Sequence, residues 1–167
     1  MEKTINPFDP IYDKNSKILI LGTFPSPDSR KAGFYYMNKR NRFWNVLKDL
    51  FHEDFPAMQK EEKITALLRH NVALYDVIHS CEIEKAEDNS IKNEIPTDID
   101  AILASCPNIK CVFLNGKKAE KLFYKHFKKQ GICAETAELP STSPANAKLS
   151  LDDLVRIWGE AILPYLQ

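Results

Sequence analysis

The sequence lacks the features that would mark a membrane-spanning protein or a metalloprotein. None of its apolar runs approaches membrane-spanning length, and residues 1–16 hold no basic stretch followed by an apolar one. No CxxC pair and no histidine at metal-ligating spacing accompanies the four cysteines, which are Cys81, Cys106, Cys111 and Cys133. We therefore expect a cytoplasmic protein with reduced thiols, no metal, no iron–sulfur cluster and no other cofactor.

The chain also has few glycines and no excess of charge of one sign. Lysine plus arginine number 23, and so do aspartate plus glutamate, so no overall positive charge indicates a nucleic-acid ligand. Any contact with DNA must therefore be local. The 5 glycines form neither GxGxxG nor GxxxxGKS/T, which disfavours a flavodoxin-like or nucleoside-binding protein that acts on a small molecule.

Short apolar runs alternate with amphipathic stretches in this chain of 167 residues, which is long enough to close one core. The runs predicted to be strands are KILILGT (17–23), VALYDVI (72–78), CVFLN (111–115) and CAETAEL (133–139). Apolar residues at helical spacing predict helices within 41–51, 61–71, 98–103, 117–129 and 151–166. We expect one domain over residues 1–167, an α/β fold built as a three-layer α/β/α sandwich around a mostly parallel four-stranded sheet.

Two connections are predicted to be irregular. Pro25 and Pro27 follow the first strand and should stop any strand or helix there, and the polar stretch from 81 to 98 should be a long loop. In a parallel sheet the ligand crevice lies at the carboxyl ends of the strands. The loops that begin at Gly22, Asn115 and Pro140 should therefore converge on one site.

The loop GTFPSPDSRKAGFYYMNKRNRFWN (22–45) combines aromatic and basic side chains. It holds Tyr35 and Tyr36, and six basic residues lie between Arg30 and Lys48 with no acid among them. Such interleaving suits an extruded nucleotide, because a base stacked on an aromatic ring gains about 1 to 3 kcal/mol and basic groups neutralise the flanking phosphates. The alternative is a hydrophobic plug with a solvated basic rim.

Polar residues also follow two later strands. Asn115 ends the CVFLN run, where its amide could read the edge of a heterocycle, or cap the next helix, or do both. The stretch LPSTSPANA (139–147) offers hydroxyls and backbone amides that could bind phosphates, although the same residues are common in plain turns.

Taken together, four blocks resemble the uracil-DNA glycosylase superfamily, and most closely its hypoxanthine-DNA (deoxyinosine) glycosylase family. They are LGTFPSPDSRKAGFYYMNKRNRFW (21–44), ALYDVIHSCE (73–82) with DNSI (88–91), VFLNG (112–116) and LPSTSPANA (139–147). The blocks occur in the family's order and span most of the chain. Asp76 and Ser90 lie in family-like segments, but the resemblance assigns them no role.

The resemblance implies a catalytic residue. Related mismatch-specific uracil glycosylases place a water-positioning asparagine where this chain has Phe24, which cannot orient water. The hypoxanthine family shows a similar apolar replacement and is thought to use the asparagine of its RNxFW segment, which is Asn41 here. The alternative role for Asn41 is an ordinary N-cap of the following helix.

The remaining site residues are also implied by the resemblance. Tyr36 corresponds to the ring that stacks on the flipped base, with Tyr35 as the second choice, and Asn115 to the residue that recognises the base edge. The implied base pocket comprises Phe24, Tyr36, Phe43 and Asn115. The implied DNA contacts are Arg40, Arg42, Ser141, Thr142, Ser143, Pro144, Ala145 and Asn146.

The expected activity is hydrolysis of the N-glycosidic bond of a deaminated base, hypoxanthine or uracil, in damaged DNA. The resemblance places no lysine as a Schiff-base nucleophile, so we expect a monofunctional, monomeric enzyme that leaves an abasic site. The competing hypothesis is a catalytically silent member of the superfamily that binds DNA, because Phe24 replaces the usual asparagine.

Overall fold

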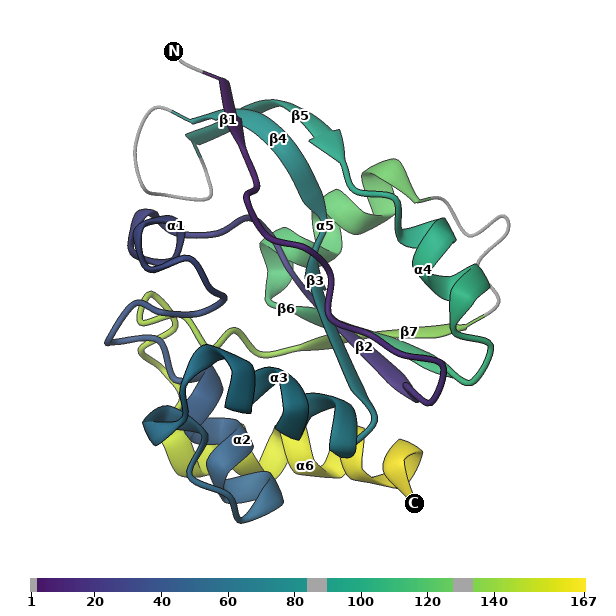
Figure 1. Cartoon of the computed structure of the whole chain (residues 1–167). Coiled ribbons are helices and arrows are strands. Elements are labelled where there is room, and N and C mark those ends of the chain that lie inside the picture. The colour runs from purple at the N-terminus through teal and green to yellow at the C-terminus, as the bar shows by residue number, and fades with distance from the viewer. Residues whose placement is uncertain (1–2, 84–89, 128–133) are drawn as a thin grey trace.

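The computed structural model describes residues 3–83, 90–127 and 134–167. Its centre is a four-stranded parallel sheet in the order β3-β2-β6-β7 (Figure 1). The strands are β2 (Ile18–Gly22), β3 (Val72–Asp76), β6 (Cys111–Asn115) and β7 (Glu135–Leu139). Every residue of β2, β3 and β6 is buried, which explains their continuous apolar runs, because both faces of such a sheet are covered.

Helices cover both faces of this sheet. They are α1 (Pro27–Ala32), α2 (Phe43–Phe51), the 3-10 turn η1 (Phe55–Ala57), α3 (Lys60–Arg69), α4 (Ile99–Ser105), α5 (Lys117–His126) and α6 (Leu151–Leu166). Helices α2, α3 and α6 lie on one side, and α4 and α5 on the other (Figure 1). The predicted three-layer sandwich is confirmed. None of the helices in the described parts is long and apolar enough to cross a membrane.

Two tryptophans connect the helical layer to the loops at the carboxyl ends of the strands. Trp158 of α6 is fully buried, and its indole N–H donates to the carbonyl of Pro140, 2.9 Å away. Trp44 of α2 donates to the carbonyl of Tyr35 at 3.0 Å. Because both indoles are packed in the core and direct their only donor to a loop, they hold these loops against the helices.

The prediction of a long loop from 81 to 98 is wrong for the described part of that stretch. Strands β4 (Ile78–Ile83) and β5 (Ile91–Pro96) pair antiparallel, and β1 (Lys3–Ile5) adds to β4. Residues 84–89 lie outside the described residues. The stretch has a polar sequence because β5 exposes much of its length to solvent. Its pairing was also not visible locally, because the strand β1 that pairs with β4 comes from the distant amino terminus.

The prediction that the prolines after β2 exclude a helix is also wrong. Pro27 is an opening residue of α1, a position at which proline costs nothing because its backbone nitrogen needs no helical partner. The Ser26 side chain caps this helix by accepting from the Ser29 amide, and Gly33 ends it with a φ of 80°. This short helix shapes the path of the loop toward Tyr35 and Tyr36.

A glycine at residue 52 should stabilise the fold. His52 ends α2 with a φ of 56°, in the left-handed region that side chains with a Cβ adopt at a cost. We expect His52→Gly to raise the free energy of unfolding by about 0.5–1 kcal/mol in urea titrations. Asp49→Gly, inside the same helix, is the control and should lower it by about 0.3 kcal/mol, because glycine is a slightly poorer helix former than aspartate. A His52→Gly protein no more stable than the wild type would contradict the prediction.

Candidate active site

Three neighbouring strands end in one row with an acid, a glycine and an amide. Gly22 pairs with Asp76 in the register of β2 and β3. On its other side, Leu21 pairs with Leu114, so Asn115 follows opposite Gly22. Residues of one row in a parallel sheet point to the same face, and strands lie about 4.8 Å apart. Asp76 and Asn115 therefore flank a position that has no side chain.

The hydroxyl group of Tyr36 occupies this position. A Cβ atom on Gly22 would lie 2.6 Å from Tyr36 Oη and 2.7 Å from Asp76 Oδ1, so both oxygens approach the glycine closely. Asn115 Nδ2 donates a hydrogen bond of 3.3 Å to the same hydroxyl. Tyr36 reaches this place with a left-handed backbone, φ 55°. The predicted stacking residue and the predicted base-edge residue are therefore in contact.

The amide of Asn115 has a defined orientation. Its Oδ1 accepts from the backbone N–H of Thr142 at 3.1 Å, and its Nδ2 donates to the Thr142 hydroxyl at 3.1 Å. A backbone N–H can only donate, so the amide oxygen must face Thr142 and the nitrogen must face Tyr36. The N-cap of α5 is Gly116, without a side-chain cap. Among the described residues, Asn115 therefore makes no capping contact with α5.

The two tyrosines have different surroundings. The ring of Tyr36 stacks on Phe43 with centroids 4.0 Å apart and an interplanar angle of 15°. Phe43 is fully buried, so it supports one face of Tyr36. Tyr35 is buried and donates to the carbonyl of Asp9 at 2.7 Å. Burial, and after it the charge of Asp76, raises the pKa of Tyr35 far above its ordinary value, so this hydroxyl stays protonated.

Arg42 holds the loop between β7 and α6. Its guanidinium donates to the backbone carbonyls of Leu149, Ser143 and Asn146, and its backbone N–H donates to the carbonyl of Thr142. Arg42 was predicted to contact DNA, but these donors point at the protein. Thr142, also predicted to contact DNA, is fully buried against Asn115.

The other predicted loop residues are accessible. Ser141, Ser143, Pro144 and Asn146 are half-buried, and Ala145 is exposed. Hydrogen bonds inside the loop run from the Ser143 amide to the Ser141 hydroxyl and from the Ala145 amide to the Ser143 hydroxyl. The loop is thus a compact turn-rich structure whose outer atoms face solvent.

Asn41 makes the local contact expected of a helix start. Its Oδ1 accepts from the Phe43 amide at 2.9 Å, while its side chain is only half-buried. An amide oxygen has a second lone pair, so this bond leaves capacity for another donor. Arg40 beside it is exposed. The N-cap of α2 is Arg42, without a side-chain cap, so Asn41 lies one residue before the cap and its bond to the Phe43 amide forms an Asx turn.

Phe24, the predicted floor of the pocket, is buried and lies beside Arg30. The Arg30 guanidinium carbon is 5.7 Å from the Phe24 ring centroid. The Nη1 atom of Arg30 is buried and has no hydrogen-bond partner among the described residues. Phe24 and Asn41 flank Tyr36 along the chain, Phe24 on the side of β2 and Asn41 on the side of α2.

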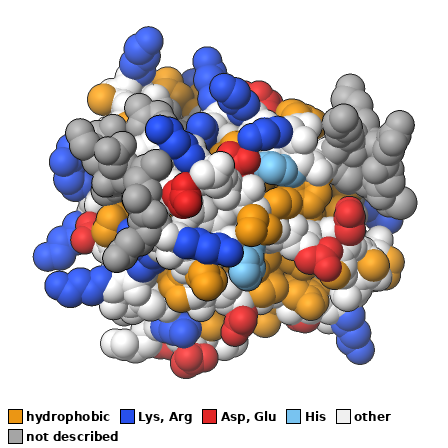
Figure 2. All heavy atoms as spheres, turned by 90° about the horizontal axis from the view of Figure 1, so that it is seen from above, with side chains coloured by type: hydrophobic (Ala, Val, Ile, Leu, Met, Phe, Trp, Pro, Cys, Tyr) orange, Lys and Arg blue, Asp and Glu red, His pale blue; other side chains and the backbone are white. Residues whose placement is uncertain are grey.

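Positive charge is dispersed rather than concentrated on the face that carries β1, β4 and β5. Seen from above, lysine and arginine side chains project from many parts of the outline, and acidic side chains lie between them (Figure 2). This agrees with the equal numbers of basic and acidic residues in the chain. Binding of a polyanion would depend on particular local groups.

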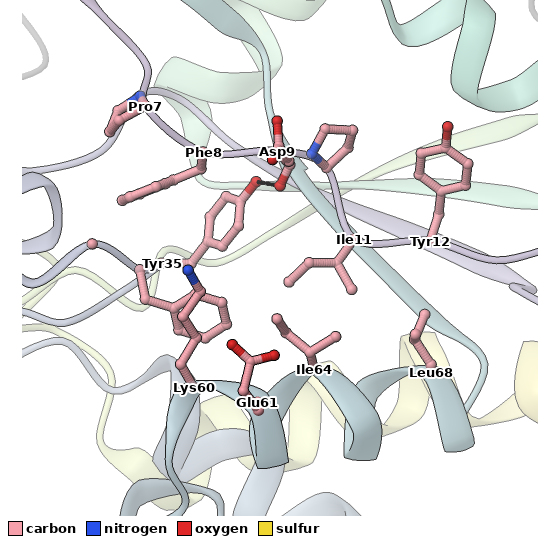
Figure 3. Close-up of a pocket in the computed structure, with 13 residues that line it drawn as sticks. Pro7, Phe8, Asp9, Ile11, Tyr12, Tyr35, Lys60, Glu61, Ile64 and Leu68 are labelled. Carbon is pink, nitrogen blue, oxygen red and sulfur yellow. Dashed lines mark hydrogen bonds between the residues drawn. The ribbon is translucent and has the colours of Figure 1, made fainter.

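A cavity of about 350 Å³ lies beside this site rather than within it. It is lined by residues 7–12, residues 33–35 and helix α3, and most of its lining is apolar (Figure 3). Tyr35 belongs to its lining, whereas Tyr36 and Asn115 do not. A site that recognises a heterocyclic base needs convergent donors and acceptors, and Tyr36, Asn115 and Asp76 place such groups at the row of strand ends.

Cys106 and Cys111 are buried free thiols, Cys81 is also buried, and Cys133 lies outside the described residues. Over residues 3–83, 90–127 and 134–167, no three His, Cys, Asp or Glu side chains gather as metal ligands would.

The sequence singled out Asp76 without a role. The structure puts its carboxylate at the site, where it is only 4% exposed and accepts from Asn6 Nδ2 at 3.0 Å. Gly22, Asp76 and Asn115 are the last residues of β2, β3 and β6, but the apolar run of the sequence continues past Asp76 to Ile78, so no local signal marked Asp76 as a strand end. Their alignment in one row needed the strand order.

The chain matches known proteins over nearly its whole length. The model of the Uracil DNA glycosylase superfamily matches residues 10–161. A hypoxanthine DNA glycosylase of Methanosarcina barkeri is 34% identical over 154 residues, which cover 92% of this chain and 95% of that protein. Another, of Methanosarcina acetivorans, is 32% identical over 143 residues, covering 86% and 89%. The solution NMR structure of a candidate uracil DNA glycosylase from Methanosarcina acetivorans has a TM-score of 0.77 and 29% identity, covering 92% and 95%.

Gly22→Ala should disturb the approach of Tyr36. The new Cβ would clash with Tyr36 Oη and Asp76 Oδ1, so we expect the free energy of unfolding in urea to fall by about 1–3 kcal/mol. In a Tyr36→Phe background the cost should be smaller, because one of the two clashing oxygens is gone.

Gly159→Ala is the matched control. Its Cβ would meet the end of the Leu50 side chain at 3.0 Å within a helix, so the change should stay within about 1 kcal/mol. An equal cost of Gly22→Ala with and without the Tyr36 hydroxyl would show that the clash lies elsewhere.

Proposed function

Since this chain belongs to the uracil DNA glycosylase superfamily, we propose that it hydrolyses the N-glycosidic bond of a deaminated base in DNA and leaves an abasic site. Two relatives that carry the name hypoxanthine DNA glycosylase support hypoxanthine as the first substrate to test, with uracil as the second. The observation that carries the proposal is the fixed Nδ2 donor of Asn115 beside the ring of Tyr36.

The extruded base would stack on the face of Tyr36 opposite Phe43. Its carbonyl oxygen would then accept from Asn115 Nδ2. Of the two hydrogen bonds donated by this nitrogen, the 3.3 Å bond to Tyr36 is longer than the 3.1 Å bond to Thr142, so it is the one that a base carbonyl replaces. As the glycosidic bond breaks, negative charge develops on the base, and one preorganised donor can contribute about 3–4 kcal/mol.

Asn41 would orient the attacking water on the sugar side. Its Oδ1 already accepts from the Phe43 amide, and the second lone pair of that oxygen would accept from water. An amide is too weak a base to remove a proton from water, so the oxocarbenium-like sugar does the activating. The water would lose its proton to solvent as its oxygen bonds to C1′, and the departing base, which leaves with the electron pair of the glycosidic bond, would take up a proton from solvent.

Duplex DNA would be held by the loop of residues 141–146 and by the exposed Arg40. Hydroxyl groups and backbone amides bind phosphates without net charge, which suits a chain with balanced charges. Arg42 would contribute indirectly, because its guanidinium fixes the loop carbonyls. The proposed enzyme is monofunctional, since the mechanism uses no lysine as a nucleophile.

A catalytically silent DNA-binding protein is the second candidate function. Two observations favour it. Phe24 stands where related enzymes carry an asparagine. Asn41, the residue proposed to take over its task, already accepts a hydrogen bond from the Phe43 amide with its Oδ1. Such a protein would flip or hold a damaged base without breaking the bond.

Base release decides between these functions. Labelled duplexes that contain hypoxanthine, or uracil opposite each normal base, are treated with protein and then with alkali. We expect release by the wild type, and a fall of at least about a hundredfold for Asn115→Ala and for Asn41→Ala, because each removes an interaction of the transition state.

Asn108→Ala is the matched control, because this exposed asparagine precedes the opposite end of β6 and should leave the rate unchanged. Strand cleavage without alkali would contradict the monofunctional mechanism. DNA binding without release from any substrate would replace the proposal with the silent binding protein.

A further inference from the structure

Asp76 is a buried carboxylate that the proposed mechanism does not use. It ends β3 in the row of Gly22 and Asn115, and it is 4% exposed. Burial of a carboxylate is costly unless hydrogen bonds and nearby dipoles compensate it. Its placement at the site, rather than in the body of the core, calls for a role.

The carboxylate of Asp76 is held in one orientation. Its Oδ2 accepts from Asn6 Nδ2 at 3.0 Å, and its backbone carbonyl accepts from the Thr97 hydroxyl at 2.8 Å. The other oxygen, Oδ1, faces Gly22. Oδ1 and the Tyr36 hydroxyl oxygen both lie within 2.7 Å of the same point, so they are at most about 5 Å apart, within the reach of a direct or water-bridged hydrogen bond.

The hydroxyl proton of Tyr36 has a preferred direction. Asn115 Nδ2 donates to this oxygen, so the oxygen is the acceptor on that side and its own proton must point elsewhere. Asp76 lies on the opposite side of Gly22 in the row. Its negative charge reaches the neighbouring tyrosines, because after burial it is the next cause of the raised pKa of both Tyr35 and Tyr75.

We propose that Asp76 is a positioning residue for base recognition: it takes the hydroxyl proton of Tyr36 in a hydrogen bond and so keeps the phenol oxygen an acceptor toward Asn115. This role rests on the proposed function. The Tyr36 ring is then held against Phe43, and the donor of Asn115 stays aimed at the place of the base carbonyl. When a base arrives, the phenol proton does not compete with Asn115 for that carbonyl.

The substitution Asp76→Asn replaces the hydrogen-bond acceptor that faces Tyr36 with a donor and keeps the shape of the side chain. Asn6 Nδ2 requires an acceptor, so the new amide would turn its oxygen to Asn6 and its nitrogen to Tyr36. The phenol would then face donors on both sides, and its proton would be released toward the base. The buried contact with Asn6 would remain, which limits the effect on folding.

A double-mutant cycle on base release tests the inference. Asp76→Asn should lower kcat at least about tenfold in the wild-type background with a smaller change in KM, and less than about twofold in the Tyr36→Phe background. Tyr35→Phe supplies the matched control pair, because the Tyr35 hydroxyl donates to Asp9, and its effect should be additive with Asp76→Asn. An equal loss in all backgrounds would assign Asp76 a structural role and overturn the inference.

A readout without catalysis separates this inference from the proposed function. In protein labelled with ¹³C-ζ tyrosine, the Tyr36 resonance is assigned by its loss in Tyr36→Phe. Asp76→Asn should shift that resonance more than those of Tyr12 and Tyr124, which are exposed. An unmoved Tyr36 signal would overturn the inference even if the enzyme is active. A shifted signal without base release from the wild type would support it and reject the glycosylase proposal.

Discussion

The close approach of the Tyr36 hydroxyl to Gly22 is the constraint on which the candidate active site depends. Only glycine leaves room between Asp76 and Asn115 for that oxygen, since a Cβ would lie 2.6 Å from it. Tyr36 adopts a left-handed backbone to reach the place, which is unfavourable for a residue with a side chain. The stack on Phe43 and the hydrogen bond from Asn115 compensate for this conformation.

A second constraint is the orientation of the Asn115 amide, and backbone groups impose it. Thr142 presents its N–H to the amide oxygen, and Arg42 holds Thr142 and the following loop through carbonyl contacts. The loop after β7, the start of α2 and the end of β6 thus form one hydrogen-bonded unit. Hydroxyl and backbone N–H groups of such a loop can also bind phosphates without carrying charge. A chain without net charge can therefore carry a candidate DNA site.

Local patterns were sufficient for the central sheet and its helices, because buried strands and amphipathic helices leave periodic signals. They failed for β4 and β5, because β4 pairs with β1, more than 70 residues away, and β5, which pairs with β4, exposes polar side chains. They also failed at Pro27, where the rule against proline in helices does not apply to an opening residue. In both places the structure depends on where a residue or strand lies in the fold, which the local amino-acid composition does not reveal.

The sequence by itself determined the fold class, the loops that begin at Gly22 and Asn115, and the aromatic and basic loop between β2 and α2, whereas it placed Asp76 inside a strand of residues 72–78. Only the tertiary structure decided which tyrosine meets Asn115, that Arg42 holds a loop, and that Asp76 faces Gly22. The reason is the strand order β3-β2-β6-β7, which sets Gly22 between two residues distant in sequence. Such contacts, as between Tyr36 and Asn115, 79 residues apart, leave no periodic signal in either segment.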